Sequence, residues 1–426
     1  MRNPFKLSVL FILALLLSAQ MPALAEFDLP ASTVVIQERA FENVPLSDVT
    51  VDLPEGLQRI EARAFAGTGI TKIYIPQSVT FIAPDAFDLG GDFHPIVESG
   101  SYAKEWCNEN GVTPYTITGL GAASRSQSAI RSFIAEHPSS TSGLPEFRQA
   151  PTGGAYGGDE YNYGLLTEES LNNAINMVNQ VRYIAGLNAD VVNASNREAA
   201  LAASALVNGL NGTISHSPSR PTALQDAKYD ELFALAQQGA SSSNLFAGVS
   251  NLAASVLGYM DDSDSSNIPM VRHRRWIINP SMSRTTFGFY QSNSGYRYYS
   301  GMYSFDMSGS GSQSPVAWPA QQTPISYFGY NRGRNNCAWS VSFGRYVDPA
   351  AVEVTLVNTK TRQQWHFSSA AADGYFNVNN VGYGQTGCVI FRPDGISISA
   401  GDTYQVTVTN SANYTILRYS VTFFSL

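Results

Sequence analysis

The first part of the chain carries one short pattern three times: Ile36-Gln37-Glu38-Arg39-Ala40-Phe41, Ile60-Glu61-Ala62-Arg63-Ala64-Phe65 and Ile82-Ala83-Pro84-Asp85-Ala86-Phe87. The pattern recurs after 24 and then 22 residues, and short alternating segments that favour strands lie between the copies, at 49–53 and 72–75. One such unit cannot cover its own apolar face, so consecutive units are expected to stack. We therefore predict a short solenoid in which Phe41, Phe65 and Phe87 form an internal column.

The repeated Ile-x-x-x-Ala-Phe resembles the leucine-rich repeats of the BspA type. On this resemblance we assign residues 26–118 to a repeat domain. We expect a helix over 101–111 to close it, because the last repeat would otherwise leave its core exposed to water. Repeats of this kind imply contact with other proteins. The expected partners are surface proteins of a host or of a neighbouring cell, and the expected role is adhesion.

The N-terminus has the pattern of a secretory signal peptide. Arg2 and Lys6 precede an apolar run at 7–17, which ends in Ala23-Leu24-Ala25. We expect residues 1–25 to be removed from a bacterial protein that is secreted and extracellular, either free or held non-covalently at the cell surface. The apolar run is shorter than the roughly 20 residues that a transmembrane helix needs. No transmembrane segment is therefore expected.

The charge of the mature chain argues against one class of partner. Loss of Arg2 and Lys6 with the signal peptide takes the formal net charge from −8 to −10. A surface of this sign repels the phosphates of nucleic acids and anionic lipids. No nucleic acid partner is expected.

Composition and periodicity divide the rest of the chain into three parts. Residues 119–160 are rich in Gly, Ser, Ala and Pro and predict a flexible linker with one short helix at 128–137. In the next part, 161–310, Thr167 is placed to cap a helix. Apolar spacing there predicts further elements, namely helices at 197–209, 221–238 and 251–260 and strands at 285–290 and 296–306. In the last part, 315–426, short alternating segments separated by turns predict an all-β sandwich.

His216 and His273 stand out among the five histidines by their setting. His216 follows a helix of small residues, in Gly212-Thr213-Ile214-Ser215-His216, and His273 opens the segment Arg272-His273-Arg274-Arg275-Trp276. Together with Asn179-Gln180-Val181-Arg182, this order resembles the CAP superfamily of secreted proteins. The resemblance implies an α-β-α sandwich over 161–310, with both histidines facing one central cleft and a small apolar or lipid-like ligand bound there.

The resemblance also points to further site residues, with two departures. A Glu-Asn-Leu-like motif of the family reads Ser243-Asn244-Leu245 here, so Ser243 stands where an acid is expected. The second acid follows an aromatic residue by three positions, which selects Tyr259 and Asp262. Asp261 and Asp264 are neighbours that could take the same place. We name Ser243, Asn244 and Tyr259 as ligand-binding candidates.

Two imidazoles and a carboxylate in one cleft suggest a metal-dependent alternative. Neutral histidine is a good zinc ligand, although a third protein ligand is ordinarily needed. In this interpretation His216 and His273 bind zinc and Asp262 is the base of a hydrolase or peptidase.

Structural interpretations of the same residues are kept beside the functional ones. His216 could hydrogen-bond a backbone carbonyl and simply hold the fold together. Arg274 could pair with Asp261, Asp262 or Asp264 and stabilise a loop without chemistry.

The three cysteines leave two alternatives open. An exported chain permits disulfides, and Cys337 and Cys388 fall in the same β-rich segment, so one bond would join them and leave Cys107 free. The other alternative is three buried thiols.

Three hypotheses of function follow from these features. The leading one is an extracellular binding protein, with repeats that contact proteins and a cleft that holds a small apolar ligand. The second is a metal-dependent hydrolase, and the third is a structural spacer in the cell envelope.

Overall fold

The computed structural model describes residue 27, residues 29–47 and residues 51–426. The chain forms two compact units, Met1–Ile117 and Thr118–Leu426, and each is described by itself. The expected signal peptide, 1–25, lies outside the described residues. In the described part of the chain, no helix is both long and apolar enough to cross a membrane.

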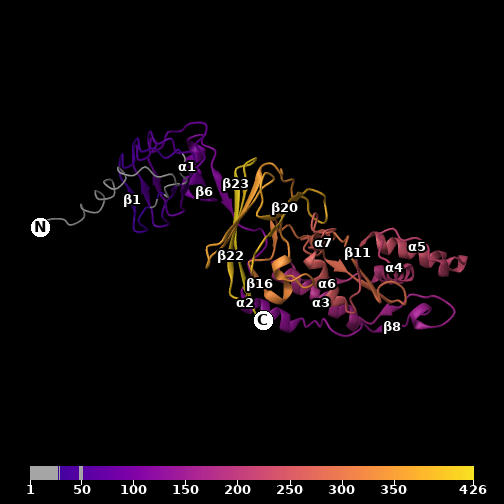
Figure 1. Ribbon diagram of the computed structural model, residues 1–426. Coiled ribbons are helices and arrows are strands. Elements are labelled where there is room, and N and C mark those ends of the chain that lie inside the picture. Colours follow the sequence, from indigo (N-terminus) through magenta and orange to yellow (C-terminus); the bar gives the residue numbers. More distant parts are fainter. Residues whose placement is uncertain (1–26, 28, 48–50) are drawn as a thin grey trace. The chain divides into compact units, whose positions relative to one another are not determined.

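The repeats of the first unit stack through two ladders of parallel strands (Figure 1). One ladder pairs Ile36 with Ile60 and Ile60 with Ile82, the first residues of the three repeated patterns. Its strands are β1 (Val35–Ile36), β3 (Arg59–Ile60) and β5 (Phe81–Ile82). The strands of the other ladder are β2 (Val51–Asp52), β4 (Ile73–Ile75), β6 (Ile96–Glu98) and β7 (Tyr115–Thr118).

A column of phenylalanine rings forms the core between the ladders, as predicted. Phe65 stacks between Phe41 and Phe87, with ring centroids 5.3 and 5.2 Å apart. Helix α1 (Tyr102–Glu109) lies at the end of the stack, where Trp106 meets Phe87 edge-on at 6.0 Å. The closing helix expected at 101–111 is therefore present, and it protects the last repeat from water.

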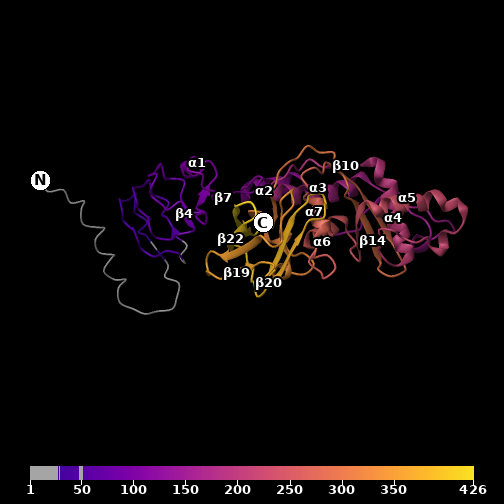
Figure 2. The same ribbon diagram turned by 90° about the horizontal axis from the view of Figure 1, so that it is seen from above.

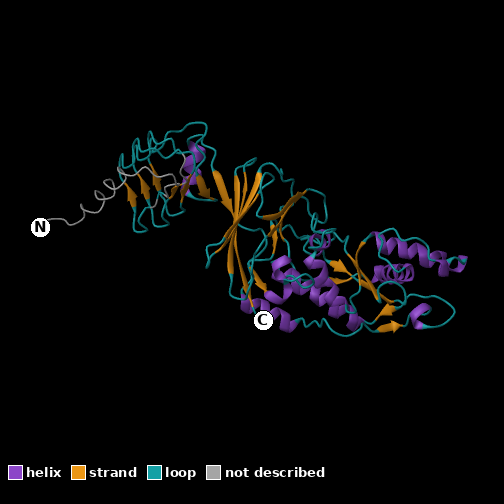
Figure 3. Ribbon diagram, viewed as in Figure 1, coloured by secondary structure: helices purple, strands orange, loops and turns teal. Residues whose placement is uncertain are grey.

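The second unit begins with most of the helices of the chain (Figure 3). The helices are α2 (Gln127–Glu136), α3 (Glu168–Ile184), α4 (Glu198–Asn211), α5 (Asp230–Ser241), α6 (Leu252–Asp261) and α7 (Arg272–Ile277). The strands among them are β8 (Phe147–Gln149), β9 (Leu165–Leu166), β10 (Val192–Asn193), β11 (Ser243–Ala247), β12 (Arg284–Thr285), β13 (Phe287–Gln291) and β14 (Tyr298–Tyr303). Thr167 caps α3, as expected, because its side chain accepts a hydrogen bond from the backbone N–H of Ser170.

A three-stranded antiparallel sheet, in the order β11-β14-β13, has helices on both faces (Figure 2). Alternate residues of β13 face opposite sides. Phe287 and Phe289 share a core with α3 and α6, whereas Tyr290 packs with α4 and α5. At Gly288 the sheet and α4 approach closely, because a Cβ there would lie 2.1 Å from the carbonyl oxygen of Leu201. This glycine lets α4 lie directly on the sheet.

Strands dominate the chain after residue 315. Their bounds are β15 (Val316–Trp318), β16 (Gln322–Pro324), β17 (Trp339–Ser342), β18 (Val352–Asn358), β19 (Gln364–Phe367), β20 (Gly374–Asn379), β21 (Cys388–Pro393), β22 (Thr403–Asn410) and β23 (Thr415–Phe424). One sheet has the order β15-β17-β21-β20, and the other includes β19-β18-β22-β23 with β16 beside β23. Trp339 of the first sheet packs against Tyr404 and Phe423 of the second, with ring centroids 5.6 and 5.9 Å apart. The two sheets therefore pack against one another.

The segment 119–160 differs from the flexible linker that its composition predicts. It belongs to the second unit and contains α2, whose Phe133 stacks on Tyr183 of α3 at 4.1 Å. Strand β8 pairs with β9. Side chains of α3 also bind its backbone, since Asn173 donates to the carbonyl of Ser140 and Asn176 to that of Pro138. Polar composition was misleading because these bonds come from a distant helix.

Of the two alternatives left open for the cysteines, the structure has the three buried thiols and no bond between Cys337 and Cys388. Cys107, Cys337 and Cys388 are all buried free thiols. In the ladder between β17 and β21, Cys388 pairs with Ser342, five residues beyond Cys337. At about 3.3 Å per residue the two cysteines lie roughly 16 Å apart along the strand, too far for a disulfide.

Candidate functional site

His216 and His273, far apart in the sequence, line one pocket of about 660 Å³ in the second unit. His216 lies in the loop after α4, and His273 lies in α7. The pocket also contains Tyr259 and Asp262 from the end of α6. The convergence of the two imidazoles that the sequence suggested is therefore present in this fold.

His273 is held in place by Asp262. The Oδ1 atom of Asp262 lies 2.8 Å from the Nδ1 atom of His273, and Oδ2 accepts the backbone N–H of the same residue at 2.9 Å. Asp262 follows α6 in the left-handed conformation, with φ of 45°, which turns its carboxylate back toward α7. Only 1% of the Asp262 side chain is exposed, against 14% for His273. Asp262 therefore stands behind the ring and orients it.

The motif residue Arg182 fixes the other end of α7. Its Nη1 atom donates to the carbonyls of Ile277 and Asn279, at 2.9 and 2.6 Å, where the helix ends. These carbonyls have no partner inside the helix, so a cation is favourable there. Burial lowers the pKa of Arg182 to about 10. The role of Arg182 is thus to position the helix that carries His273.

His216 is tied down through one ring nitrogen. Its Nδ1 atom lies 2.9 Å from the carbonyl oxygen of Ala240, and because a carbonyl can only accept, Nδ1 carries the proton. The loop itself is pinned by Asn208, whose Oδ1 accepts the N–H of Ser215 at 2.8 Å. Partial burial lowers the pKa of His216, while the bond to Ala240 opposes this and a charge on His273 adds to it. His216 is therefore neutral at neutral pH, with Nε2 available to a ligand.

Ser243 and Asn244 do not line the pocket, in contrast to the expectation. Both are buried in β11 behind it. Asn244 donates through Nδ2 to the carbonyl of His273 at 3.1 Å and accepts at its own carbonyl from the hydroxyl of Tyr259 at 3.0 Å. Ser243 donates weakly to Ala240 at 3.4 Å. These residues join the backbones that carry the two histidines.

Tyr259 lines the pocket, and its ring centroid is 5.5 Å from that of His273. Its side chain is buried, which raises the pKa of the phenol. Since only 1% of Tyr259 is exposed and its hydroxyl is bonded to Asn244, its ring forms the wall against which His273 lies.

The lining of the pocket contains both apolar and polar groups. Ile214, Phe246 and Tyr296 supply the apolar groups, and Ile214 and Tyr296 are 43% and 59% exposed. Arg272 and Arg332 are the arginines among the polar lining. Such a mixture suits a ligand with both an apolar and a polar part.

Two lining residues come from a part of the chain that no sequence motif links to the pocket. Asn331 and Arg332 precede β17, and their backbone N–H groups donate to Oδ2 of Asp261, at 2.8 and 2.7 Å. This contact spans 70 residues of sequence. No local motif signals it, so only the fold reveals that residues beyond 310 complete the pocket.

Arg274 forms none of the expected ion pairs with the neighbouring aspartates. Its guanidinium is fully buried and donates to the backbone carbonyls of Met260, Asp261 and Ala338. The carboxylates nearby are engaged elsewhere, Asp261 with the 331–332 backbone and Asp262 with His273. Arg274 therefore joins α6 and α7 to the strand region through the main chain.

The fit of this site to zinc is limited to two imidazole nitrogens. In each histidine Nδ1 is engaged, which leaves Nε2 for a metal. Both oxygens of Asp262 are bonded to His273, so it fits the role of an orienting carboxylate behind a metal ligand, not that of a third ligand or a base facing the pocket. Among the residues that the structure describes, no three or more His, Cys, Asp or Glu side chains form a metal-binding group.

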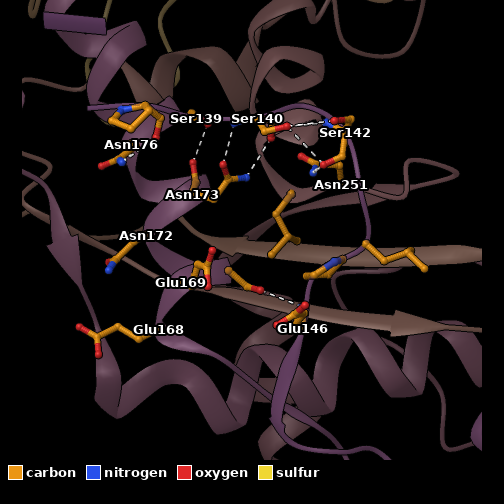
Figure 4. Close-up of a pocket in the computed structure, with 15 residues that line it drawn as sticks. Ser139, Ser140, Ser142, Glu146, Glu168, Glu169, Asn172, Asn173, Asn176 and Asn251 are labelled. Carbon is orange, nitrogen blue, oxygen red and sulfur yellow. Dashed lines mark hydrogen bonds between the residues drawn. The ribbon is translucent and has the colours of Figure 1, made fainter. Parts of the chain in front are cut away.

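A second hollow, of about 780 Å³, lies between α3 and the segment that follows α2 (Figure 4). The side chain of Asn173 makes two hydrogen bonds with this segment, and Asn251 donates to the carbonyl of Ser142 at 2.8 Å. Glu168 and Glu169 lie in the first turn of α3, where negative charge is favourable. The polar groups of this hollow thus hold the segment on the helix.

Comparison with known families identifies one region of the chain. A BspA type leucine-rich repeat region, in six copies, matches residues 19–94. The predicted repeats are therefore confirmed from residue 26 to residue 94. No curated protein matches the chain.

Proposed function

We propose that this protein is a secreted bacterial surface protein that binds other proteins through its repeats and a small ligand in the pocket of His216 and His273. Residues 19–94 support the first part, because BspA-type repeats are suited to protein contact. The observation that carries the second part is that both histidines line one pocket with Nδ1 engaged.

The second unit supports the resemblance to the CAP superfamily on which this proposal draws. Its three-stranded sheet lies between α4 and α5 on one side and α3 and α6 on the other, and the two histidines line one pocket. Within the pocket, Phe246 and Tyr296 offer ring surface to the apolar part of a ligand. The two histidines offer nitrogen to its polar part.

Filling the pocket tests the ligand part of the proposal. Ala247 is half-buried in the lining, so Ala247→Trp reduces the space, whereas Ala370→Trp places the same side chain on an exposed turn. A fluorescent fatty acid analogue is titrated into each full-length variant. We expect saturable binding to the wild type and to Ala370→Trp, and at least a tenfold loss in Ala247→Trp. Equal binding of the fatty acid analogue by Ala247→Trp and Ala370→Trp would contradict a ligand in this pocket and would favour the hypothesis of a structural spacer.

Deleting the repeats tests the adhesive part. Binding of the full chain to whole cells or extracellular matrix is compared with that of a chain lacking residues 26–118. The proposal expects binding to disappear with the deletion. Binding that survives would assign adhesion to the second unit.

A metal-dependent hydrolase is the second candidate, and the pair of Asp262 and His273 favours it. A carboxylate behind an imidazole is the usual support of a metal-binding histidine. Bound zinc would supply an acidified water or a polarised carbonyl, and His216 and His273 would hold it through Nε2. Stoichiometric zinc together with peptide hydrolysis, both lost in the His216→Ala/His273→Ala double variant, would establish this function in place of simple binding.

A further inference from the structure

A smaller cavity of about 290 Å³ lies next to the histidine pocket and has a different chemistry. Ser263 and Arg332 line both cavities, so the two are adjacent. The other polar groups of the small cavity come from the strand region, and they include Arg392 at the end of β21 and Asn335 and Asn336 before β17. The chain as a whole is acidic, yet this lining holds two arginines against one acid, Asp394.

Both guanidinium groups of the cavity retain donors for a ligand. Within the described residues, neither Arg332 nor Arg392 forms an ion pair. Arg392 makes one long bond, from Nη1 to the carbonyl of Ser263 at 3.5 Å. The charge of Arg332, together with hydrogen bonds from Ser266 and Asn267, lowers the pKa of Asp264 against the opposing effect of burial. Arg332 therefore acts on its surroundings through its charge while its N–H groups remain available.

The backbone around these side chains is fixed before any ligand arrives. The N–H of Arg332 is bound by Asp261 at 2.7 Å, and its carbonyl accepts from Asn336 at 3.2 Å. Asn335 accepts the N–H of Ile398 through Oδ1 at 3.0 Å. With its oxygen engaged, the side-chain amide of Asn335 has its NH₂ group left for a ligand, and this group can only donate. The cavity thus gathers two guanidinium groups and an amide donor on a preorganised frame.

We propose that this cavity is an anion-binding site, in which Arg332 and Arg392 bind a phosphate or carboxylate group. Two guanidinium groups match the oxygens of either anion with charge-assisted hydrogen bonds. The volume is sufficient for one such group. Because Arg332 and Ser263 are shared, the same anion would be the charged end of a ligand whose apolar part lies in the histidine pocket. This last step rests on the proposed function, whereas the anion site itself does not.

Titration of the full-length protein with inorganic phosphate and, separately, with acetate tests the site. Binding is followed by calorimetry for the wild type, Arg332→Gln, Arg392→Gln and the control Arg334→Gln. Arg334 lies two residues from Arg332 but lines neither cavity. We expect saturable binding of at least one anion, weakened about tenfold or more in the first two variants and unchanged in the control. The stronger of the two anions identifies the charged group.

Other results would overturn the inference. These are no saturable binding of either anion, or equal weakening in Arg334→Gln. Arg332 is exposed, so its variant is expected to fold even if the strand residue Arg392 proves less tolerant. The His216→Ala/His273→Ala variant should bind the anion as the wild type does. The two proposals can fail separately. If Ala247→Trp still binds the fatty acid analogue while the anion titration gives the expected result, the proposed ligand pocket is wrong and the anion site is supported.

Discussion

The carboxylate of Asp262 bonds His273 twice, through Oδ1 to the ring Nδ1 at 2.8 Å and through Oδ2 to the backbone N–H at 2.9 Å. The residue that resemblance suggests as a base is therefore the support of the imidazole. Its place in the fold follows from the left-handed turn at the end of α6, which brings it against the first turn of α7.

Removal of the Asp262 carboxylate should destabilise the protein and free the ring of His273. For Asp262→Ala we expect a loss of about 2 kcal/mol in the free energy of unfolding, because buried donors lose a charged acceptor. Urea denaturation measures this loss, and ¹⁵N NMR reports the proton on Nδ1 of His273. Asp262→Asn is the matched control, since Asn tolerates the left-handed turn and keeps one acceptor. Equal stability and an unchanged ring signal in Asp262→Ala would contradict the supporting role.

The lowered pKa of His216 predicts a specific dependence of stability on pH. As the pH falls, the unfolded chain binds a proton at this histidine near pH 6.5, whereas the folded protein binds it only at a lower pH. Its contribution to stability is therefore complete above about pH 6.5 and is lost as the pH falls toward the lower pKa of the folded state. His216→Gln should show a shallower fall in unfolding free energy between about pH 7 and pH 5. A slope identical to that of the wild type would show that His216 is not perturbed.

The phenylalanine column predicts the largest effect of a single substitution in the repeats. Phe65 is fully buried and stacked on both sides, so Phe65→Ala should cost about 3–5 kcal/mol in the stability of the first unit. Leu89→Ala, at a position that is 42% exposed, should cost much less. Calorimetric unfolding of the two variants gives the comparison. Similar transition temperatures would mean that the column is not what stabilises the stack.

The cysteines are expected to be free and unreactive in the folded protein. Burial raises the pKa of Cys107 and of Cys337 to about 12, so neither thiol forms the reactive thiolate at neutral pH. A thiol reagent should label none of the three in the folded state and all three in denaturant without a reductant. Labelling of only one thiol after unfolding would contradict this and would support a disulfide between Cys337 and Cys388.

The repeats could be predicted from the sequence because their structure is local and recurrent. Ile36, Ile60 and Ile82 recur at the spacing of the strand ladder, and the apolar column follows from the same spacing. The two histidines could be paired only by resemblance, because no periodic pattern joins residues in a loop and a helix that lie 57 positions apart.

The rest of the site could not be predicted because it depends on contacts between distant residues. Asp261 binds the backbone of residue 332 across 71 positions, and Arg274 reaches Ala338 across 64. The order of the segment after α2 could not be predicted for the same reason, since its polar composition does not indicate that Asn173 will bind it. A hydrogen bond to a backbone group does not depend on the side chain of the residue that accepts it, so the sequence does not indicate where such a bond forms.

Whether His216 and His273 act on one ligand can be tested with zinc as a probe. Full-length protein with ¹⁵N-labelled histidine is titrated with Zn²⁺ while the Nε2 signals of both residues are observed. If both residues bind one ligand, the two signals shift together along one binding curve. His216→Ala then weakens the response of His273 at least tenfold, while His366→Ala, at an exposed position of β19, does not. Separate curves for the two histidines, or a response of His273 that His216→Ala leaves unchanged, would contradict it.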